Sequence, residues 1–329
     1  MRREGWRACD GSHILIRMLG LFFDDNGILL RRDALAQGVD DNALRRALRA
    51  GYIVRIRQGV YVLSERWEVA TAVERHTLLL ASVRRLYDDT VAASHVSACI
   101  EQGGPTWGLD LSSVHVTSLD GTSERNQAKV IHHRGVCRVG DLTRDDAGWI
   151  TAPTRTALDT ASLAPQEPAV AVLDWFLKSK MTTRDELEVA FAAMKHWPDT
   201  LALHRVLQLA DGTAESVGET RTRLMLRGQR LPAPVAQMEI WHPSGLLAGR
   251  VDFAWPERRV MLEFDGMQKY HRLRREGESI EQMVMREKHR EDLLRELTGW
   301  LMIRITWADL DRPRTTADRI LRCFAQAAA

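Results

Sequence analysis

The sequence has few cysteines and no long hydrophobic run. Its four cysteines are widely separated and form no Cys-x-x-Cys pair, which argues against a zinc site or a disulfide framework. The longest apolar runs, such as LLLASV at 78–83, are far shorter than the roughly 20 residues that a membrane-spanning helix needs. The first residues, MRREGWRACDGS, contain no apolar segment of the kind found in signal peptides. We therefore expect a soluble, cytoplasmic protein with reduced thiols and no membrane partner.

Lysine is scarce as well. The chain has 40 arginines and 6 lysines, with a formal net charge of +2. Two explanations stay open: a GC-rich genome, or selection of arginine for contact with phosphate groups. The 329 residues, 45% hydrophobic and 27% charged, have the composition of a globular protein. That length predicts two or three domains of roughly 100 to 150 residues each.

The order of elements in residues 12–63 is that of a winged helix-turn-helix. An amphipathic helix ending near Phe22 precedes two short helices, RRDALAQG and DDNALRRALRAG, and an alternating hairpin, YIVRIRQGVYVL. Such a module lays its second motif helix in the DNA major groove and its wing along the backbone or in the minor groove. The alternative is a solvated arginine face on a small helical domain. The candidate DNA-binding residues are Asn42, Arg45, Arg46, Arg49, Arg55 and Arg57.

The middle of the chain shows no catalytic machinery. Residues 66–211 read as several helices with short strands around VHVTS and KVIHHRG, which predicts a mixed α/β connector domain. His132 and His133 are neighbours on the second of these strands, so their side chains point to opposite faces and do not easily share a metal. We interpret both as structural or surface residues.

Three carboxylates interrupt two apolar strands in RVDFAWPERRVMLEFDG, residues 250–266. If the strands form a hairpin about Glu257, Asp252 pairs with Glu263 across the ladder, and Asp265 lies on the same face as Glu263. Opposed like charges need compensation, which hard oxygen-bound cations supply. This pattern predicts a Mg²⁺ or Mn²⁺ site formed by Asp252, Glu263 and Asp265, suited to phosphodiester hydrolysis.

Residue Glu219 is a fourth candidate, with two roles. It precedes the hairpin on a predicted helix, from which it can reach the same site. In SVGE, residues 216–219, it also completes a capping box with Ser216. The two roles exclude each other only if its side chain turns back toward the start of the helix.

The stretch from about 215 to 310, with SxGExxxR, GRVDFAWPERRVMLEFDG and REKHREDLLRELTGWLMIRITWADL, resembles restriction-endonuclease-like (PD-(D/E)XK) proteins of the very-short-patch-repair-like branch. The N-terminal module resembles the winged helix of AbiEi-type antitoxins, and actinobacterial proteins that join both domains look similar over nearly the whole chain. The resemblance implies catalytic roles for Glu219, Asp252 and Glu263. Many members have a lysine where this chain has Asp265, so either Lys269 or His271 replaces it or the site is inactive.

Together these features predict an α/β multidomain protein: a winged helix-turn-helix at 1–65, a central mixed α/β domain at 66–211 and a restriction-endonuclease-like domain at 212–329. One hypothesis is a metal-dependent DNA endonuclease targeted by its own winged helix. The other is an antitoxin-like transcriptional repressor in which the nuclease fold is an inactive scaffold. A third reading is a module that neutralises a cognate toxin.

Overall fold

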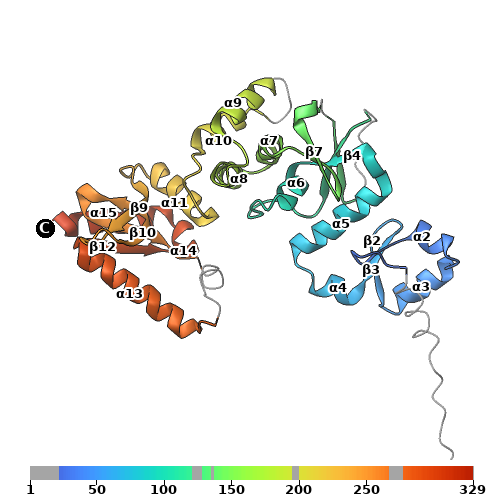
Figure 1. Ribbon diagram of the computed structural model, residues 1–329, viewed down its shortest axis with the longest axis horizontal. Coiled ribbons are helices and arrows are strands. Elements are labelled where there is room, and N and C mark those ends of the chain that lie inside the picture. Colours follow the sequence, from blue (N-terminus) through green and yellow to red (C-terminus); the bar gives the residue numbers. More distant parts are fainter. Residues whose placement is uncertain (1–21, 121–127, 135–136, 195–199, 267–276, 329) are drawn as a thin grey trace, which may run out of the picture. The chain divides into compact units, whose positions relative to one another are not determined.

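The protein, analysed as a computed structural model, is described over residues 22–120, 128–134, 137–194, 200–266 and 277–328. It falls into two compact units, Met1–Thr160 and Ala161–Ala329. The predicted boundaries near residues 65 and 211 divide the chain differently, and the three-domain division stays a prediction. The described residues form a mixed α/β structure with a three-, a four- and a five-stranded sheet (Figure 1). In these ranges no helix has both the length and the apolar character needed to cross a membrane.

The first unit begins with the winged-helix module and continues into a five-stranded sheet. Its elements are β1 (Ile28–Leu30), α2 (Arg31–Ala36), α3 (Asp41–Arg49), β2 (Ile53–Arg57), β3 (Val60–Leu63), α4 (Ser64–Val69), α5 (Ala72–Tyr87), β4 (Val91–Ala93), α6 (His95–Glu101), β5 (Val114–Ser118), β6 (Val130–His133), β7 (Leu142–Asp145), β8 (Gly148–Thr151) and α7 (Pro153–Leu163). The strand orders are β1-β3-β2 and β6-β5-β4-β8-β7.

The winged-helix elements form where the sequence predicts them. The side chain of Asp40 caps α3 by accepting the backbone N–H of Ala43 at 2.7 Å, as expected for an aspartate at this position. The chain leaves α3 at Gly51, and the β2–β3 hairpin turns at Gly59, both with the positive φ that glycine adopts readily. The predicted first helix, up to Phe22, lies almost entirely outside the described residues.

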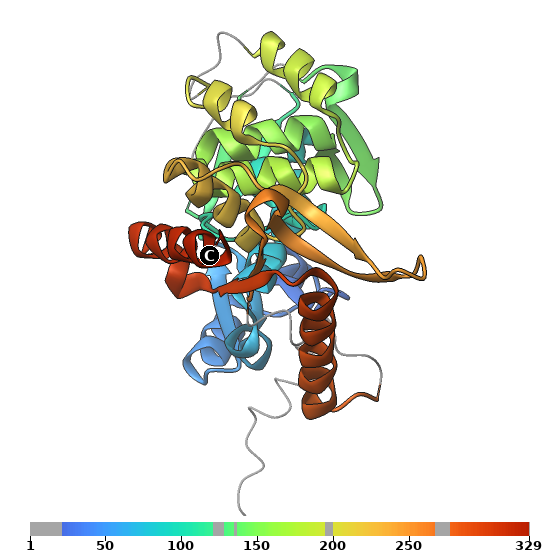
Figure 2. The same cartoon turned by 90° about the vertical axis from the view of Figure 1, so that its left-hand side faces the viewer.

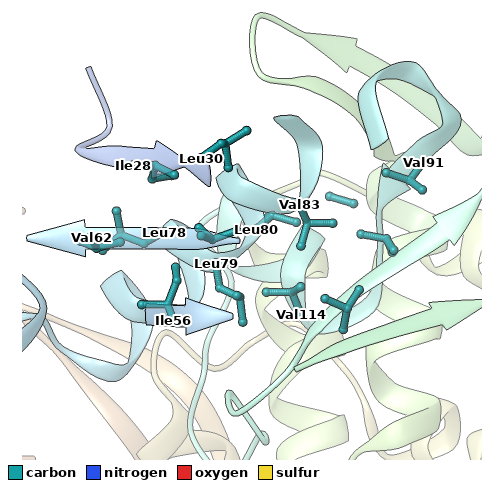
Figure 3. Packing of buried hydrophobic residues seen from close by; sticks show 14 of the residues in the cluster. Ile28, Leu30, Ile56, Val62, Leu78, Leu79, Leu80, Val83, Val91 and Val114 are labelled. Carbon is teal, nitrogen blue, oxygen red and sulfur yellow. The ribbon is translucent and has the colours of Figure 1, made fainter. Parts of the chain in front are cut away.

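Helix α5 joins the winged helix to the five-stranded sheet through one hydrophobic core. Figure 3 shows residues of β1, β2 and β3 packed with Leu78, Leu80 and Val83 of α5 and with Val114 of β5. Ion pairs add to this contact, because Arg85 of α5 binds Asp24 and Asp33 of the winged helix. Residues on both sides of position 65 therefore contribute to one core.

The second unit is a helical region followed by a four-stranded sheet. Its elements are α8 (Gln166–Lys178), α9 (Arg184–Ala193), α10 (Leu203–Leu209), α11 (Val217–Gly228), β9 (Val235–Trp241), β10 (Leu247–Trp255), β11 (Val260–Phe264), α13 (Ile280–Thr298), β12 (Leu301–Ile305), α14 (Trp307–Leu310) and α15 (Pro313–Ala328). The sheet order is β12-β11-β10-β9, antiparallel except that β12 runs parallel to β11.

Helices cover both faces of this sheet (Figure 2). On one face, α13 packs Leu294 against Val251 and Met261. On the other, Ile320 and Phe324 of α15 pack against the strands. The parallel β11–β12 pair needs a long crossover, which α13 supplies. Of the carboxylates in the hairpin β10–β11, Glu263 is buried and Asp252 is half-buried.

Candidate nucleic-acid interface

Helix α3 presents a polar, mostly basic face to solvent. Ala43, Leu44 and Ala47 are buried against β1 and β2, which fixes the orientation of the helix. The side chains on the opposite face are all exposed: Asn42, Arg45, Arg46 and Arg49. This confirms the predicted division of α3 into an apolar and a basic face. An exposed helix in this position of a winged-helix module is the element that enters the major groove.

Two of these side chains already interact with each other. Nη1 of Arg45 donates to Oδ1 of Asn42 at 3.1 Å. An asparagine and an arginine side by side suit base edges, because asparagine reads adenine and arginine reads guanine through paired hydrogen bonds. Arg46 and Arg49 are exposed basic groups of the kind that contact phosphates. The roles of all four in DNA binding stay predictions.

The wing differs from the simple alternation that the sequence predicts. Arg55 is exposed, but the pairing of β2 with β3 shifts register between Arg55 and Arg57. Arg57 is half-buried, and its positive charge is among the causes that lower the pKa of His132, after burial of that imidazole. Arg57 therefore faces the five-stranded sheet of its own unit, so Arg55 is the better candidate for a backbone contact.

The hairpin of the second unit has the predicted register. Phe253 pairs with Leu262 and Ala254 with Met261, so Asp252 and Glu263 come next along the ladder. Oδ2 of Asp252 accepts the backbone N–H of Phe264 at 2.8 Å. Asp265 is half-buried just past the end of β11. One oxygen of Asp252 is thus already hydrogen-bonded to the adjacent strand, β11.

An arginine compensates the buried Glu263. Nη2 of Arg290, on α13, lies 2.6 Å from Oε1 of Glu263, whose residue is 8% exposed. Arg290 also binds Glu287 at 3.1 Å, and Arg304 lies 3.9 Å from the second oxygen of Glu263. Burial alone lowers the pKa of Arg290, but Glu263 and Glu287 outweigh burial and raise it. A guanidinium group thus compensates the charge of Glu263, one of the three carboxylates for which a cation was predicted.

Glu219 lies in the first turn of α11, whose N-cap is Ser216. Its side chain turns back to accept the hydroxyl of Ser216 at 2.7 Å and the backbone N–H of Glu215 at 2.9 Å. It also accepts the side-chain amide of Gln237 at 2.7 Å, and it is only 2% exposed. Of the two roles that the sequence allowed, these contacts support the capping role.

The predicted divalent metal site stays a prediction. No three histidine, cysteine, aspartate or glutamate side chains within the described ranges are placed to hold an ion. Glu263 is paired with Arg290, one oxygen of Asp252 accepts a backbone N–H, and Glu219 accepts the hydroxyl of Ser216, the N-cap of α11. Lys269 and His271, the candidates to replace the missing lysine, lie outside the described residues.

The sequence did not reveal a cluster of two buried histidines and one half-buried histidine in the first unit. His95, His115 and His133 come together from α6, β5 and β6, beside Asp159 of α7. His132 contacts Tyr87 instead, so the prediction that His132 and His133 point to opposite faces is confirmed. The available signal was that His95, His115 and His133 each lie in or directly after a short apolar stretch.

Comparisons with known proteins extend these observations. Residues 20–64 match the family described as "Transcriptional regulator, AbiEi antitoxin". Two Mycobacterium tuberculosis relatives, "Uncharacterized protein MT2308" of strain CDC 1551 / Oshkosh and "Uncharacterized protein Rv2248" of strain H37Rv, are each 32% identical over 276 residues, or 83% of this chain and 92% of theirs. The crystal structure of the RV2827C protein from the same species aligns with a TM-score of 0.40 at 15% identity, covering 75% of this chain and 92% of that one.

Proposed function

Because this chain belongs to the family of the M. tuberculosis proteins MT2308 and Rv2248, and carries an AbiEi antitoxin domain of the transcriptional-regulator type at residues 20–64, we propose that it is a DNA-binding transcriptional regulator. The observation that carries the proposal is α3. Its apolar face is buried, and its exposed face presents Asn42, Arg45, Arg46 and Arg49 inside the matched residues.

Its target is the DNA upstream of its own coding sequence, as for a repressor of the antitoxin type. Helix α3 enters the major groove, where Asn42 and Arg45 contact base edges and Arg46 and Arg49 contact phosphates. Arg55 of the wing contacts the adjacent backbone. The arginine-rich composition supports this proposal, since guanidinium groups pair with phosphate oxygens in a fork geometry.

The test is binding of the upstream DNA at several salt concentrations. Arg45→Ala is expected to weaken binding by about 1–3 kcal/mol and to relax sequence preference. Arg46→Ala is expected to weaken binding to all sequences and to lower the slope of log affinity against log salt by about one. The matched control is Arg205→Ala, an exposed arginine on α10 of the second unit. Equal affinity and salt slope in all four proteins would refute the proposal.

We propose that the second unit is a scaffold of the restriction-endonuclease-like type rather than a metal-dependent nuclease. Support for the architecture comes from its element order: a helix, three antiparallel strands, the crossover helix α13 and a strand parallel to the third. Support for the scaffold role comes from Glu263, which is paired with Arg290.

The antitoxin description also supports a cognate toxin protein as a second partner. Co-expression of the tagged chain with the products of adjacent genes tests this part of the proposal. Recovery of one neighbour in a stoichiometric complex supports it. Recovery of the tagged chain alone from every pair tested counts against it.

A further inference from the structure

The five-stranded sheet of the first unit carries a stack of histidine side chains. The rings of His95 and His133 stack with centroids 3.6 Å apart. Nδ1 of His115 lies 2.8 Å from Nε2 of His133. His95 has a backbone φ of 50°, a left-handed conformation that is uncommon for residues other than glycine. The surrounding structure therefore holds the ring of His95 against a conformational cost.

A fourth histidine ties this stack to the helix that supports the winged helix. Nδ1 of His76, on α5, lies 3.2 Å from the carbonyl oxygen of Leu111. A carbonyl only accepts, so Nδ1 carries the proton and Nε2 accepts from the Ser97 hydroxyl at 2.8 Å. The Ser97 oxygen in turn accepts the backbone N–H of His115 at 2.7 Å. This chain of hydrogen bonds is complete when His76 is neutral.

The contact between His115 and His133 holds a single proton. One ring donates to the other, so charging both rings places two N–H groups against each other and breaks the bond. Burial, with the neighbouring His133 and His76 next, lowers the pKa of His115 to about 3. Burial, with His133 and His115 next, also holds the pKa of His95 well below its ordinary value.

The charged groups around the stack do not offset the cost of protonating its rings. Arg155 of α7 is a further cation that lowers the pKa of His95. Asp159 of α7 has one oxygen 4.0 Å from Nδ1 of His95, but both its oxygens already accept from Nε of Arg155 at 2.8 Å. Asp110, ahead of β5, opposes the shift of His115, and its effect is smaller than that of burial.

We propose that protonation of His95, His115 and His133 releases the winged helix from the sheet that supports it, a proton-operated release. This inference rests on the proposed DNA-binding function. While the three rings are neutral, the five-stranded sheet stays closed and completes the core that it shares with α5 and the winged helix. Proton uptake places like charges in ring contact, opens β5 and β6, and withdraws that support from the winged helix.

The direction of the pH effect follows from these pKa values. They lie below the ordinary value of 6.5, so the unfolded chain binds more protons than the folded chain between pH 6.5 and about 3. The contribution of these histidines to folding stability is therefore fully present above pH 6.5, and it is lost as the pH falls from 6.5 toward 3. Asp159 opposes part of the loss, because burial raises its pKa to about 6 and the folded chain then takes up a proton there. Asp159 offsets about one of the two protons that His95 and His115 take up on opening.

The test is hydrogen exchange of β5 and β6 in the full chain, measured by mass spectrometry between pH 6 and pH 5 and corrected for intrinsic exchange rates. One net proton predicts that the opening equilibrium constant rises about tenfold over this unit of pH. His133→Gln removes one ring of the stack and one like-charged neighbour of the other two. Its opening constant is expected to rise clearly less than that of the natural chain.

Two further variants serve as controls. His289→Gln replaces an exposed histidine on α13 and is expected to behave as the natural chain does. His132→Gln replaces a buried histidine on the same strand that contacts Tyr87 rather than the stack. It is expected to flatten the pH dependence less than His133→Gln does. Equal flattening by both variants overturns the proposal, because the stack then has no special role.

Binding of the upstream DNA separates this inference from the function beneath it. The natural chain is expected to lose at least about tenfold in affinity from pH 7.5 to pH 5.0, and His133→Gln to lose less. If neither protein binds this DNA at pH 7.5, the proposed function fails. If both bind at pH 7.5 and lose affinity equally, the function stands and the proton-operated release is refuted.

Discussion

The substitution Asp174→Ala is expected to destabilise the second unit strongly. Asp174 lies on α8 and is 1% exposed. One oxygen accepts the backbone N–H groups of Asp211 and Gly212 at 2.9 and 3.3 Å. The other accepts the hydroxyl of Thr220 at 2.7 Å and Nη2 of Arg223 at 2.6 Å. A single carboxylate thus joins α8, the 211–212 turn and α11.

The magnitude follows from what the substitution leaves behind. Breaking a buried ion pair by removing one partner costs about 3–5 kcal/mol. The lower half of that range applies here, because Arg223 keeps the carbonyl oxygen of Leu209 at 2.6 Å and the carboxylate of Asp211 at 3.0 Å. Thr220, however, is 1% exposed and loses its acceptor. We expect a loss of about 3.5 kcal/mol, which lowers the melting temperature of a unit of this size by about 10 °C.

Calorimetry of the full chain measures the shift, and hydrogen exchange at residues 211–228 assigns it to the second unit. The control is Asp318→Ala, an exposed aspartate on α15, which is expected to change stability by less than about 0.5 kcal/mol. For a unit of this size, a shift of about 2 °C corresponds to about 0.5–1 kcal/mol. If Asp174→Ala melts within about 2 °C of the natural chain, the assigned role of this carboxylate is wrong.

Three more expectations follow from single contacts. Gly218→Ala places a methyl group 1.9 Å from the ring of Phe264, so we expect overpacking to lower the free energy of unfolding by about 1–3 kcal/mol, measured in urea. The control Gly228→Ala, on the same helix, meets nothing within 4 Å and should not destabilise the protein. Arg85→Ala removes two aspartate partners and should cost about 1–2 kcal/mol in the first unit; unchanged urea unfolding would contradict this. Supercoiled plasmid incubated with Mg²⁺ or Mn²⁺ should stay intact, and nicking that disappears in Asp252→Ala would reverse the scaffold interpretation.

Local patterns in the sequence predicted most of the elements. The strand predicted at residues 235–241 is β9, and the helix predicted at 279–298 is α13, Ile280–Thr298. Helix α3 was predictable because an aspartate cap, an apolar stripe and a terminal glycine all fall within a dozen residues. The hairpin register was predictable for a similar reason, since alternation within two short strands leaves one pairing that keeps Phe253 and Leu262 together.

The sequence by itself determined the basic face of α3 and the pairing of Asp252 with Glu263 across their hairpin, because both depend on spacing within a few residues. Only the tertiary structure decided what neutralises Glu263, since Arg290, 27 residues further along the chain, reaches it from α13. The same holds for His95, His115 and His133, which three elements bring together. Side-chain partners across elements depend on how helices and strands pack, and periodicity along the chain carries little information about that packing.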